Sequence, residues 1–293
     1  MKNRRLLVTG GSGFLGRRVV GRASDFETVL AGSWSHGERC ESSPRIQVTA
    51  LDLGEEEAER HIVELAPTAI VHTAAVNPGG PEDRMEAVNV RGTAAVARAA
   101  ARLGCRLVHV STDVVHNGNE APYADDAPPK PMWIYGRTKA EGEAAVKRLY
   151  PDAVIVRTSL IYGLNEVDRV TAGFIERLQE GETLTLFTDQ IRQPIWVETL
   201  ATVLLELLQL NVSGYLNIAG DQALTRNEIA QRLLDFWDAP EGKIELVRSA
   251  DLGIQRPRDL RLDLRQALNL LQTPLPGMDA VLAHIKEPSN TSI

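Results

Sequence analysis

The sequence predicts an α/β protein built on a doubly wound parallel sheet, followed by a smaller part of mixed α and β structure. Six short apolar runs recur through the first 160 residues, with helical patterns between them. A glycine-rich turn directly follows the first run, and after residue 160 the alternation becomes less regular. Strands that alternate with helices are typical of β-α-β units, which place their strands parallel in one sheet.

The elements of the first part follow one another in a regular order. We expect strands over residues 5–10, 28–33, 45–50, 69–75, 106–112 and 153–159. The helices between them are expected over residues 15–23, 55–65, 89–104 and 135–150. Because each crossover in a parallel sheet is commonly a helix, these helices should cover the sheet.

The second part of the chain contains fewer expected helices and strands, and they are less regularly spaced. Helices are expected over residues 171–181, 198–210 and 227–237, and a strand over 214–220. We predict that residues 1–160 and about 194–219 form the sheet domain, and that about 161–193 with 220–285 form the smaller domain. The polar stretch 286–293 is expected to be a disordered tail by its composition.

Composition and charge favour a small-molecule partner in the cytoplasm. The formal net charge is −7, so no global field attracts nucleic acid or an anionic membrane surface. No apolar run approaches the ~20 residues that span a bilayer. Cys40 and Cys105 lie far apart without C-x-x-C spacing, which predicts neither a disulfide framework nor a metal site.

The glycine-rich turn lies between the first expected strand and the first expected helix. The stretch VTGGSGFLG places Gly10, Gly13 and Gly16 at G-x-x-G-x-x-G spacing. Glycine allows a sharp turn, lets a pyrophosphate approach backbone N–H groups, and permits close packing of helix and strand. A ligand-free turn is the alternative, but the strand-turn-helix context favours dinucleotide binding.

The end of the second expected strand bears on the choice between NAD and NADP. NAD sites usually place an acidic residue there to hold the ribose hydroxyls, whereas the segment AGSWSHG has no carboxylate. Ser33 and Ser35 can bond a 2′-phosphate, His36 can add partial charge, and Arg17 or Arg18 can reach it. NADP(H) is therefore favoured, with NAD(H) as the alternative.

A tyrosine and a lysine lie four residues apart on the helix expected after the fifth strand. Tyr135 and Lys139 therefore share one helix face, one turn apart. A nearby ammonium stabilises a phenolate and lowers the pKa of the phenol from ~10. Ser111, Thr112 and Asp113 end the fifth strand in the same expected cleft, where the Thr112 hydroxyl can hold a substrate carbonyl.

Four motifs, TGGSGFLG, STD, YGRTK and RTSLIYG, resemble the extended short-chain dehydrogenase/reductase family over nearly the whole chain. The resemblance implies a Rossmann-type sheet with a smaller substrate-binding domain, and a catalytic set of Thr112, Tyr135 and Lys139. With the turn and strand described above, it implies cofactor contacts at Gly10, Ser12, Gly13, Phe14, Leu15, Gly16, Ser33, His36, Asp52, Leu53, Ala74, Ala75, Asn89, Tyr135, Lys139 and Ser159.

Within that family, residues 111–143 and the segment TDQIRQPIWVETLA are similar to dTDP-4-dehydrorhamnose reductases and related sugar-nucleotide reductases. This resemblance implies reduction of a 4-keto group on a nucleotide-activated deoxysugar, with Tyr135 as general acid assisted by Lys139 and Thr112. Expected substrate contacts are Asp113, Val114, Arg192 and Arg256. Val114, Leu160, Arg192 and Ile195 replace residues common in those reductases, Tyr, Trp, Gly and Thr, so the sugar remains open.

Other functions of the same fold remain as alternatives. A 4,6-dehydratase would carry glutamate where Val114 stands, which argues against elimination chemistry. A 4-epimerase uses the same Thr, Tyr and Lys with retained NAD, and the absence of an acid after the second strand counts modestly against it. A non-catalytic NADP-binding subunit, like the regulatory subunit of methionine adenosyltransferase, also shares the Tyr-x-x-x-Lys motif. A homodimer is compatible with the sequence.

Overall fold

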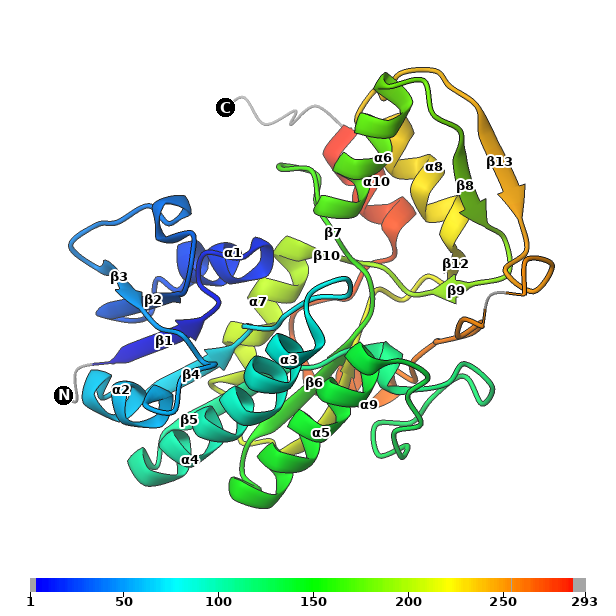
Figure 1. Cartoon of the computed structure of the whole chain (residues 1–293). Helices are drawn as coiled ribbons and strands as arrows, with labels where there is room; N and C mark the ends of the chain where they lie inside the picture. The colour runs from blue at the N-terminus through cyan, green and yellow to red at the C-terminus, as the bar shows by residue number, and fades with distance from the viewer. Residues whose placement is uncertain (1–3, 254, 287–293) are drawn as a thin grey trace.

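The computed structural model describes residues 4–253 and 255–286. Its centre is a seven-stranded parallel sheet in the order β11-β6-β5-β4-β1-β2-β3 (Figure 1). The strands are β1 (Arg5–Thr9), β2 (Thr28–Ser33), β3 (Ile46–Ala50), β4 (Ala69–His72), β5 (Arg106–Val110), β6 (Val154–Thr158) and β11 (Gly214–Ile218). The order reverses between β1 and β4, and ligands of such sheets bind outside the carboxyl ends of the strands at this point. The predicted doubly wound sheet is confirmed.

Helices cover both faces of the sheet because its strands are apolar on both sides. In β1, Leu6 and Val8 belong to the core cluster with α1 (Phe14–Arg22) and α7 (Val197–Leu207). Leu7, between them, points into the opposite cluster with α2 (Ala58–Leu65), α4 (Thr93–Leu103) and α5 (Ile134–Leu149). Side chains alternate across a strand, so two buried faces produce the continuous apolar runs seen in the sequence. A short helix α3 (Glu82–Met85) and a π-helical stretch, Glu86–Gly92, lead into α4.

The second part forms its own small core. Helices α6 (Arg169–Gln179), α8 (Arg226–Phe236) and α10 (Met278–Lys286) lie together, away from the helices that cover the sheet (Figure 1). Beside them β8 (Leu184–Phe187) pairs in parallel with β13 (Ile244–Val247). Helix α9 (Arg265–Leu270) packs on the sheet core through Ala267.

Two short strand pairs connect the second part to the sheet. In one pair β7 (Ile161–Tyr162), just beyond β6, runs parallel to β10 (Ile195–Trp196), which leads into α7. In the other, β9 (Ile191–Arg192) runs antiparallel to β12 (Leu224–Thr225), which leads into α8. The chain therefore crosses between the two parts at neighbouring places.

Most expected elements are present, and the differences have simple causes. The sequence prediction missed β8 and β13, which are four residues long and only partly buried, and α10, which follows a proline-rich stretch. The predicted tail lies outside the described residues except for Lys286, with which α10 ends. The boundaries of the two domains stay a prediction.

Residues 4–253 and 255–286 contain neither a membrane-spanning helix nor a cluster of metal-binding side chains. There, no helix is long and apolar enough to cross a membrane. The same residues contain no group of three or more His, Cys, Asp or Glu side chains that could hold a metal ion. Cys40 and Cys105 are buried free thiols.

Candidate functional site

The glycine turn is closely packed against the ends of β1 and β4. Gly10 has a φ of +68°, which side-chain-bearing residues rarely adopt, and a Cβ on Gly16 would lie 2.0 Å from the Gly10 carbonyl oxygen. At the start of α1, no side chain of the described residues caps the helix N-terminus at Gly13. Its N–H groups are therefore available for an anionic ligand. Phe14 packs against the core and Leu15 lies within it.

Two serines meet where the glycine turn faces the end of β2. The hydroxyls of Ser12 and Ser33 lie 2.7 Å apart, and the His36 N–H donates to Ser33 Oγ at 3.4 Å. The exposed His36 ring contacts Glu38 through Nδ1, 3.2 Å from Oε1. The carboxylate of Glu38 therefore lies near the end of β2, although Glu38 comes five residues after Ser33 in the sequence.

Arg17 and Arg18, considered above as contacts of a 2′-phosphate, both pair with one carboxylate. Arg17 Nη2 lies 2.7 Å from Glu166 Oε1, and Arg18 Nη2 lies 2.8 Å from Glu166 Oε2. Glu166 belongs to the loop between β7 and α6. The first helix and this loop are therefore tied together beside the glycine turn.

Asp52 and Leu53, which were expected to contact the cofactor, lie beside a residue pair that the sequence did not indicate. Asp52 Oδ1 accepts hydrogen bonds from the Gly54 N–H at 2.7 Å and from Arg84 Nη2 at 2.6 Å. The Arg84 guanidinium lies 4.2 Å from the ring centre of the exposed Trp34. Leu53 is buried in the core. The tryptophan within AGSWSHG was a signal that could have been used, because an exposed aromatic ring at a strand end is uncommon.

Ala74, Ala75 and Asn89 lie around the loop that follows β4. The Ala74 N–H points to the end of β1, and Ala75 follows it at the loop surface. Asn89 is buried; its Oδ1 accepts from the Val76 N–H at 2.8 Å, and its Nδ2 donates to Thr138 Oγ1 at 3.2 Å. Asn89 thus connects this loop to α5, which is a supporting position.

Tyr135 and Lys139 occupy the first turns of α5. Lys139 Nζ donates to the Val110 carbonyl at the end of β5, at 2.8 Å. Burial lowers the pKa of Lys139 to about 8, and Glu143 acts in the opposite direction. Burial, and then the Asp113 carboxylate, raise the pKa of Tyr135 to about 12. This direction is opposite to the sequence expectation, because burial and the Asp113 carboxylate both disfavour the phenolate.

Thr112 and Asp113 lie beside the phenol at the end of β5. Thr112 Oγ1 donates to Asp113 Oδ1 at 3.4 Å, while Ser159 Oγ donates to Asp113 Oδ2 at 2.8 Å. Arg192 Nε lies 3.8 Å from the same oxygen. Burial raises the pKa of Asp113, and Arg192 acts against that rise. Ser159, expected at the cofactor, therefore bonds Asp113 in this structure.

Three arginines gather near Asp113, and one of them was missed from the sequence. Arg192 is 3% exposed and donates to the Ile191 carbonyl, and Arg256 lies 4.2 Å from the ring centre of Trp133. The pKa of Arg226, at the start of α8, is lowered to about 10 by burial and then by Arg192 and Arg256. The pairing of β9 with β12 brings Arg192 close to Arg226, and Arg192 Nη2 donates to the carbonyl of Pro257, which follows Arg256, at 3.3 Å. Nothing in the local sequence marks Arg226, since basic residues are common on helices.

Val114 lies in the same region and makes apolar contacts there. It packs against a small apolar cluster that includes Tyr123, Leu260 and Leu262. A Cβ on Gly136 would lie 2.3 Å from the Val114 carbonyl oxygen, so this segment and the start of α5 are in close contact. Val114 is thus at the base of the candidate site.

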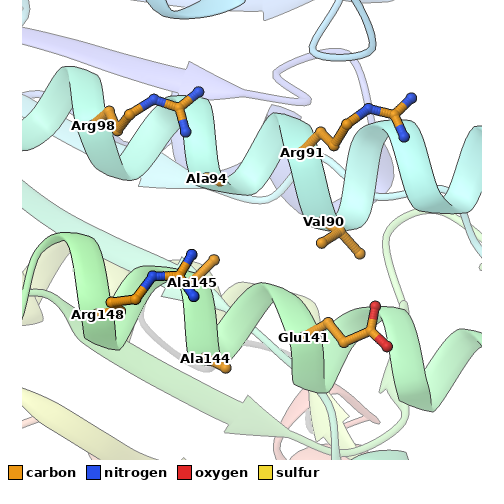
Figure 2. Close-up of a pocket in the computed structure, with 8 residues that line it drawn as sticks. All are labelled: Val90, Arg91, Ala94, Arg98, Glu141, Ala144, Ala145 and Arg148. Atoms are coloured by element: carbon orange, nitrogen blue, oxygen red, sulfur yellow. The ribbon is translucent and has the colours of Figure 1, made fainter.

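The expected site residues form two groups along the same edge of the sheet. One group surrounds the glycine turn and the ends of β2 and β4, and the other surrounds Tyr135 at the ends of β5 and β6. A hollow between α4 and α5, lined by Arg91, Arg98, Glu141 and Arg148 among others, contains none of them (Figure 2).

Comparisons with known proteins identify two kinds of relative. The chain is 32% identical over 281 residues to methionine adenosyltransferase 2 subunit beta of Bos taurus, covering 89% of this chain and 80% of that protein. It is 31% identical over 291 residues to the probable low-salt glycan biosynthesis reductase Agl14 of Haloferax volcanii, covering 95% and 96%.

Solved structures and a family match agree with the expected resemblance. A hypothetical dTDP-4-dehydrorhamnose reductase from Sulfolobus tokodaii superposes with a TM-score of 0.79 at 28% identity, covering 95% of this chain and 98% of that one. The Bacillus anthracis dTDP-4-dehydrorhamnose reductase in complex with NADP shares the fold, with a TM-score of 0.79 at 24% identity over 96% and 98%. Residues 4–289 match the family described as RmlD substrate binding domain, and the chain therefore belongs to that family of extended short-chain dehydrogenase/reductase-like proteins.

Proposed function

We propose that this protein is an NAD(P)H-dependent reductase of a 4-keto group on a nucleotide-linked deoxysugar. The observation that carries the proposal is the grouping of Thr112, Tyr135 and Lys139 on the sheet edge that also bears the uncapped glycine turn. The names of two relatives support it, since one is a probable reductase and another is a reductase in complex with NADP.

The glycine turn fits a dinucleotide because its closest approaches leave no room for side chains and its helix N–H groups are free of side-chain caps. The cofactor, when bound, supplies the hydride. Thr112 donates a hydrogen bond to the substrate carbonyl and orients it. Tyr135, with its pKa raised to about 12, is protonated at neutral pH and donates its proton to the developing alkoxide. Lys139 stabilises the phenolate that remains.

Arg192, Arg226 and Arg256 provide the positive charge that a nucleotide diphosphate needs. Arg192 and Arg226 act on the buried Asp113 carboxylate, and Arg256 and the Asp259 carboxylate act on Arg192, so the three guanidinium groups outnumber the two carboxylates. Guanidinium groups pair with phosphate oxygens through parallel hydrogen bonds. We assign the diphosphate to this cluster and the sugar ring to the space between it and Tyr135.

NADPH is the proposed cofactor in preference to NADH. Ser12, Ser33 and His36 provide hydrogen-bond donors at the end of β2, and this strand end itself carries no acid. Direct titration of the purified protein with both reduced cofactors tests the assignment. Tighter binding of NADH than of NADPH would refute it.

A cofactor-oxidation screen over nucleotide-linked 4-keto sugars tests the reductase itself. In the screen's best pair, Tyr135→Phe should reduce kcat by ~10² or more, the scale of general acid catalysis, with little change in NADPH affinity. Tyr150→Phe is the matched control, because Tyr150 ends the same helix and bonds the Cys105 carbonyl far from the site. Near-normal turnover of Tyr135→Phe would overturn the assignment.

A regulatory subunit is the second candidate, and the 32% identity to methionine adenosyltransferase 2 subunit beta favours it. Under this alternative the protein binds NADPH but oxidises none with any sugar of the panel, and Tyr135→Phe alters binding alone. The activity of a methionine adenosyltransferase catalytic subunit, measured with and without this protein, then provides the positive test.

A further inference from the structure

A third polar residue follows Tyr135 and Lys139 along the same face of α5. Glu143 lies one helical turn after Lys139 and is fully buried. Its Oε1 accepts hydrogen bonds from Ser111 Oγ at 2.6 Å and Arg157 Nε at 3.1 Å, and its Oε2 accepts from Arg157 Nη2 at 2.8 Å. Both carboxylate oxygens are thus held in a fixed position.

The partner Arg157, in β6, is also fully buried, and each of its three guanidinium nitrogens donates at least one hydrogen bond. Its Nη1 donates to the Asp125 carbonyl at 3.1 Å and to the Ala127 carbonyl at 2.8 Å. Its guanidinium lies 4.3 Å from the ring centre of Tyr215 in β11. Arg157 therefore fixes Glu143 to β6 and to the loop that precedes α5.

Fold stability alone does not require charged residues at these positions. Replacing a buried ion pair by well-packed apolar residues of similar volume is often neutral or stabilising, because the desolvation cost disappears. Lys139 is the ionisable residue one turn before Glu143 on the same face of α5, and both residues are buried.

We propose that Glu143 is a positioning residue that acts through Lys139: its carboxylate, fixed by Ser111 and Arg157, keeps the Lys139 side chain in its ammonium form beside Tyr135. The inference rests on the proposed function only for the catalytic role of Lys139. Ser111, Arg157 and Glu143 all lie within the motifs quoted above, but the motifs assigned no role to Glu143 or Arg157.

The groups that face Lys139 from neighbouring elements are consistent with this role. Burial lowers the pKa of His72, in β4, to about 3, and holds the pKa of His109, in β5, well below its usual range. Both imidazoles are therefore neutral at physiological pH, and so is the Tyr135 phenol on α5. Glu143 remains as the charge that opposes the effect of burial on Lys139.

The test measures the titration of Lys139 directly, in the presence of the full protein and without substrate. Heteronuclear NMR of protein carrying ¹³C at the lysine Cε positions, recorded over a range of pH, gives a titration midpoint for each lysine. In Glu143→Gln the midpoint for Lys139 should move down by about one pH unit, the scale expected for loss of an opposite charge nearby. Lys147 on the same helix is the internal reference.

Two matched variants separate charge from shape. Glu141→Gln makes the same change on α5, but its side chain lines the surface hollow between α4 and α5, so the Lys139 midpoint should stay in place (Figure 2). Glu143→Asp retains the charge and should restore most of the midpoint. An unchanged Lys139 midpoint in Glu143→Gln would overturn the proposal.

Turnover then distinguishes this inference from the proposed function. In an active protein, the fall of kcat/KM at high pH should move to lower pH in Glu143→Gln by the same amount as the Lys139 midpoint. If the wild type turns over no keto sugar while the midpoint still shifts, the reductase assignment fails and the role of Glu143 stands. If Glu143→Gln loses its cooperative melting, the double variant Glu143→Gln, Arg157→Gln carries the same test, because it leaves no unpaired buried charge.

Discussion

Replacement of Arg157 by methionine should be among the most destabilising single substitutions in this protein. Methionine fills similar space but removes four hydrogen bonds, two to Glu143 and two to the carbonyls of Asp125 and Ala127. It also removes the contact with the Tyr215 ring. The Glu143 carboxylate is then left in the core with only the Ser111 hydroxyl as a partner.

The size of the effect follows from the burial of both partners. Removing one member of a fully buried ion pair costs about 3–5 kcal/mol, because the remaining charge is desolvated without compensation. At ~2 °C per kcal/mol, the value for large domains, the melting temperature should fall by about 6–10 °C. The double variant Glu143→Leu, Arg157→Met should recover much of this loss, since no unpaired charge remains.

Urea unfolding followed by circular dichroism measures the change in the free energy of unfolding. Arg177→Met is the matched control, because Arg177 forms a 2.7 Å pair with Glu182 on the surface of α6 and both side chains are largely exposed. Such pairs contribute about 0–1 kcal/mol. A loss below ~1 kcal/mol for Arg157→Met, or equal losses for both variants, would refute the reasoning from burial.

Three further outcomes are expected. Gly16→Ala should abolish NADPH binding, measured by fluorescence titration, because the new Cβ would lie 2.0 Å from the Gly10 carbonyl oxygen. Gly21→Ala, also in α1 but with open space around it, should bind NADPH normally. Equal binding by the two variants would contradict the prediction. The kcat/KM of the reductase should be level at neutral pH and fall as the pH rises through about 8. The reason is that burial lowers the pKa of Lys139 to about 8, above which Lys139 loses its charge. A kcat/KM that stays level up to pH ~10 would contradict this prediction. Arg226→Gln should raise the KM for the nucleotide sugar by about tenfold or more, the scale of a lost charged hydrogen bond. The affinity for NADPH should not change. An unchanged KM would exclude Arg226 from the site.

The sheet could be predicted from the sequence because its physical cause is local. Strands buried on both faces are largely apolar, as in β6, where Val154, Ile155 and Val156 are all buried. The glycine turn was equally readable, since its spacing reflects close backbone contacts. By contrast, β8 and β13 are short and half-exposed, so their composition differs little from that of loops.

Much of the candidate site could not be predicted, because its contacts join residues far apart in the chain. Arg226 is close to Arg192 only because β12 pairs with β9. Glu143 meets Ser111 across 32 positions, and no periodicity in the sequence indicates such a contact. The direction of the pKa shift of Tyr135 also depends on burial in the folded protein and on the Asp113 carboxylate, and neither could be read from the spacing of Tyr135 and Lys139.

The position of β11 at the edge of the sheet has a consequence for how the protein can be divided. The chain leaves the sheet after β6, builds α6 and β8, and returns to add β11 beside β6. A fragment that stops before Gly214 would expose one whole edge of β6, a strand whose residues are all buried in the intact protein. Open apolar edges of this kind recruit strands from other chains. We therefore expect such a fragment to aggregate when it is produced alone, because it lacks β11, which covers the edge of β6 in the intact protein.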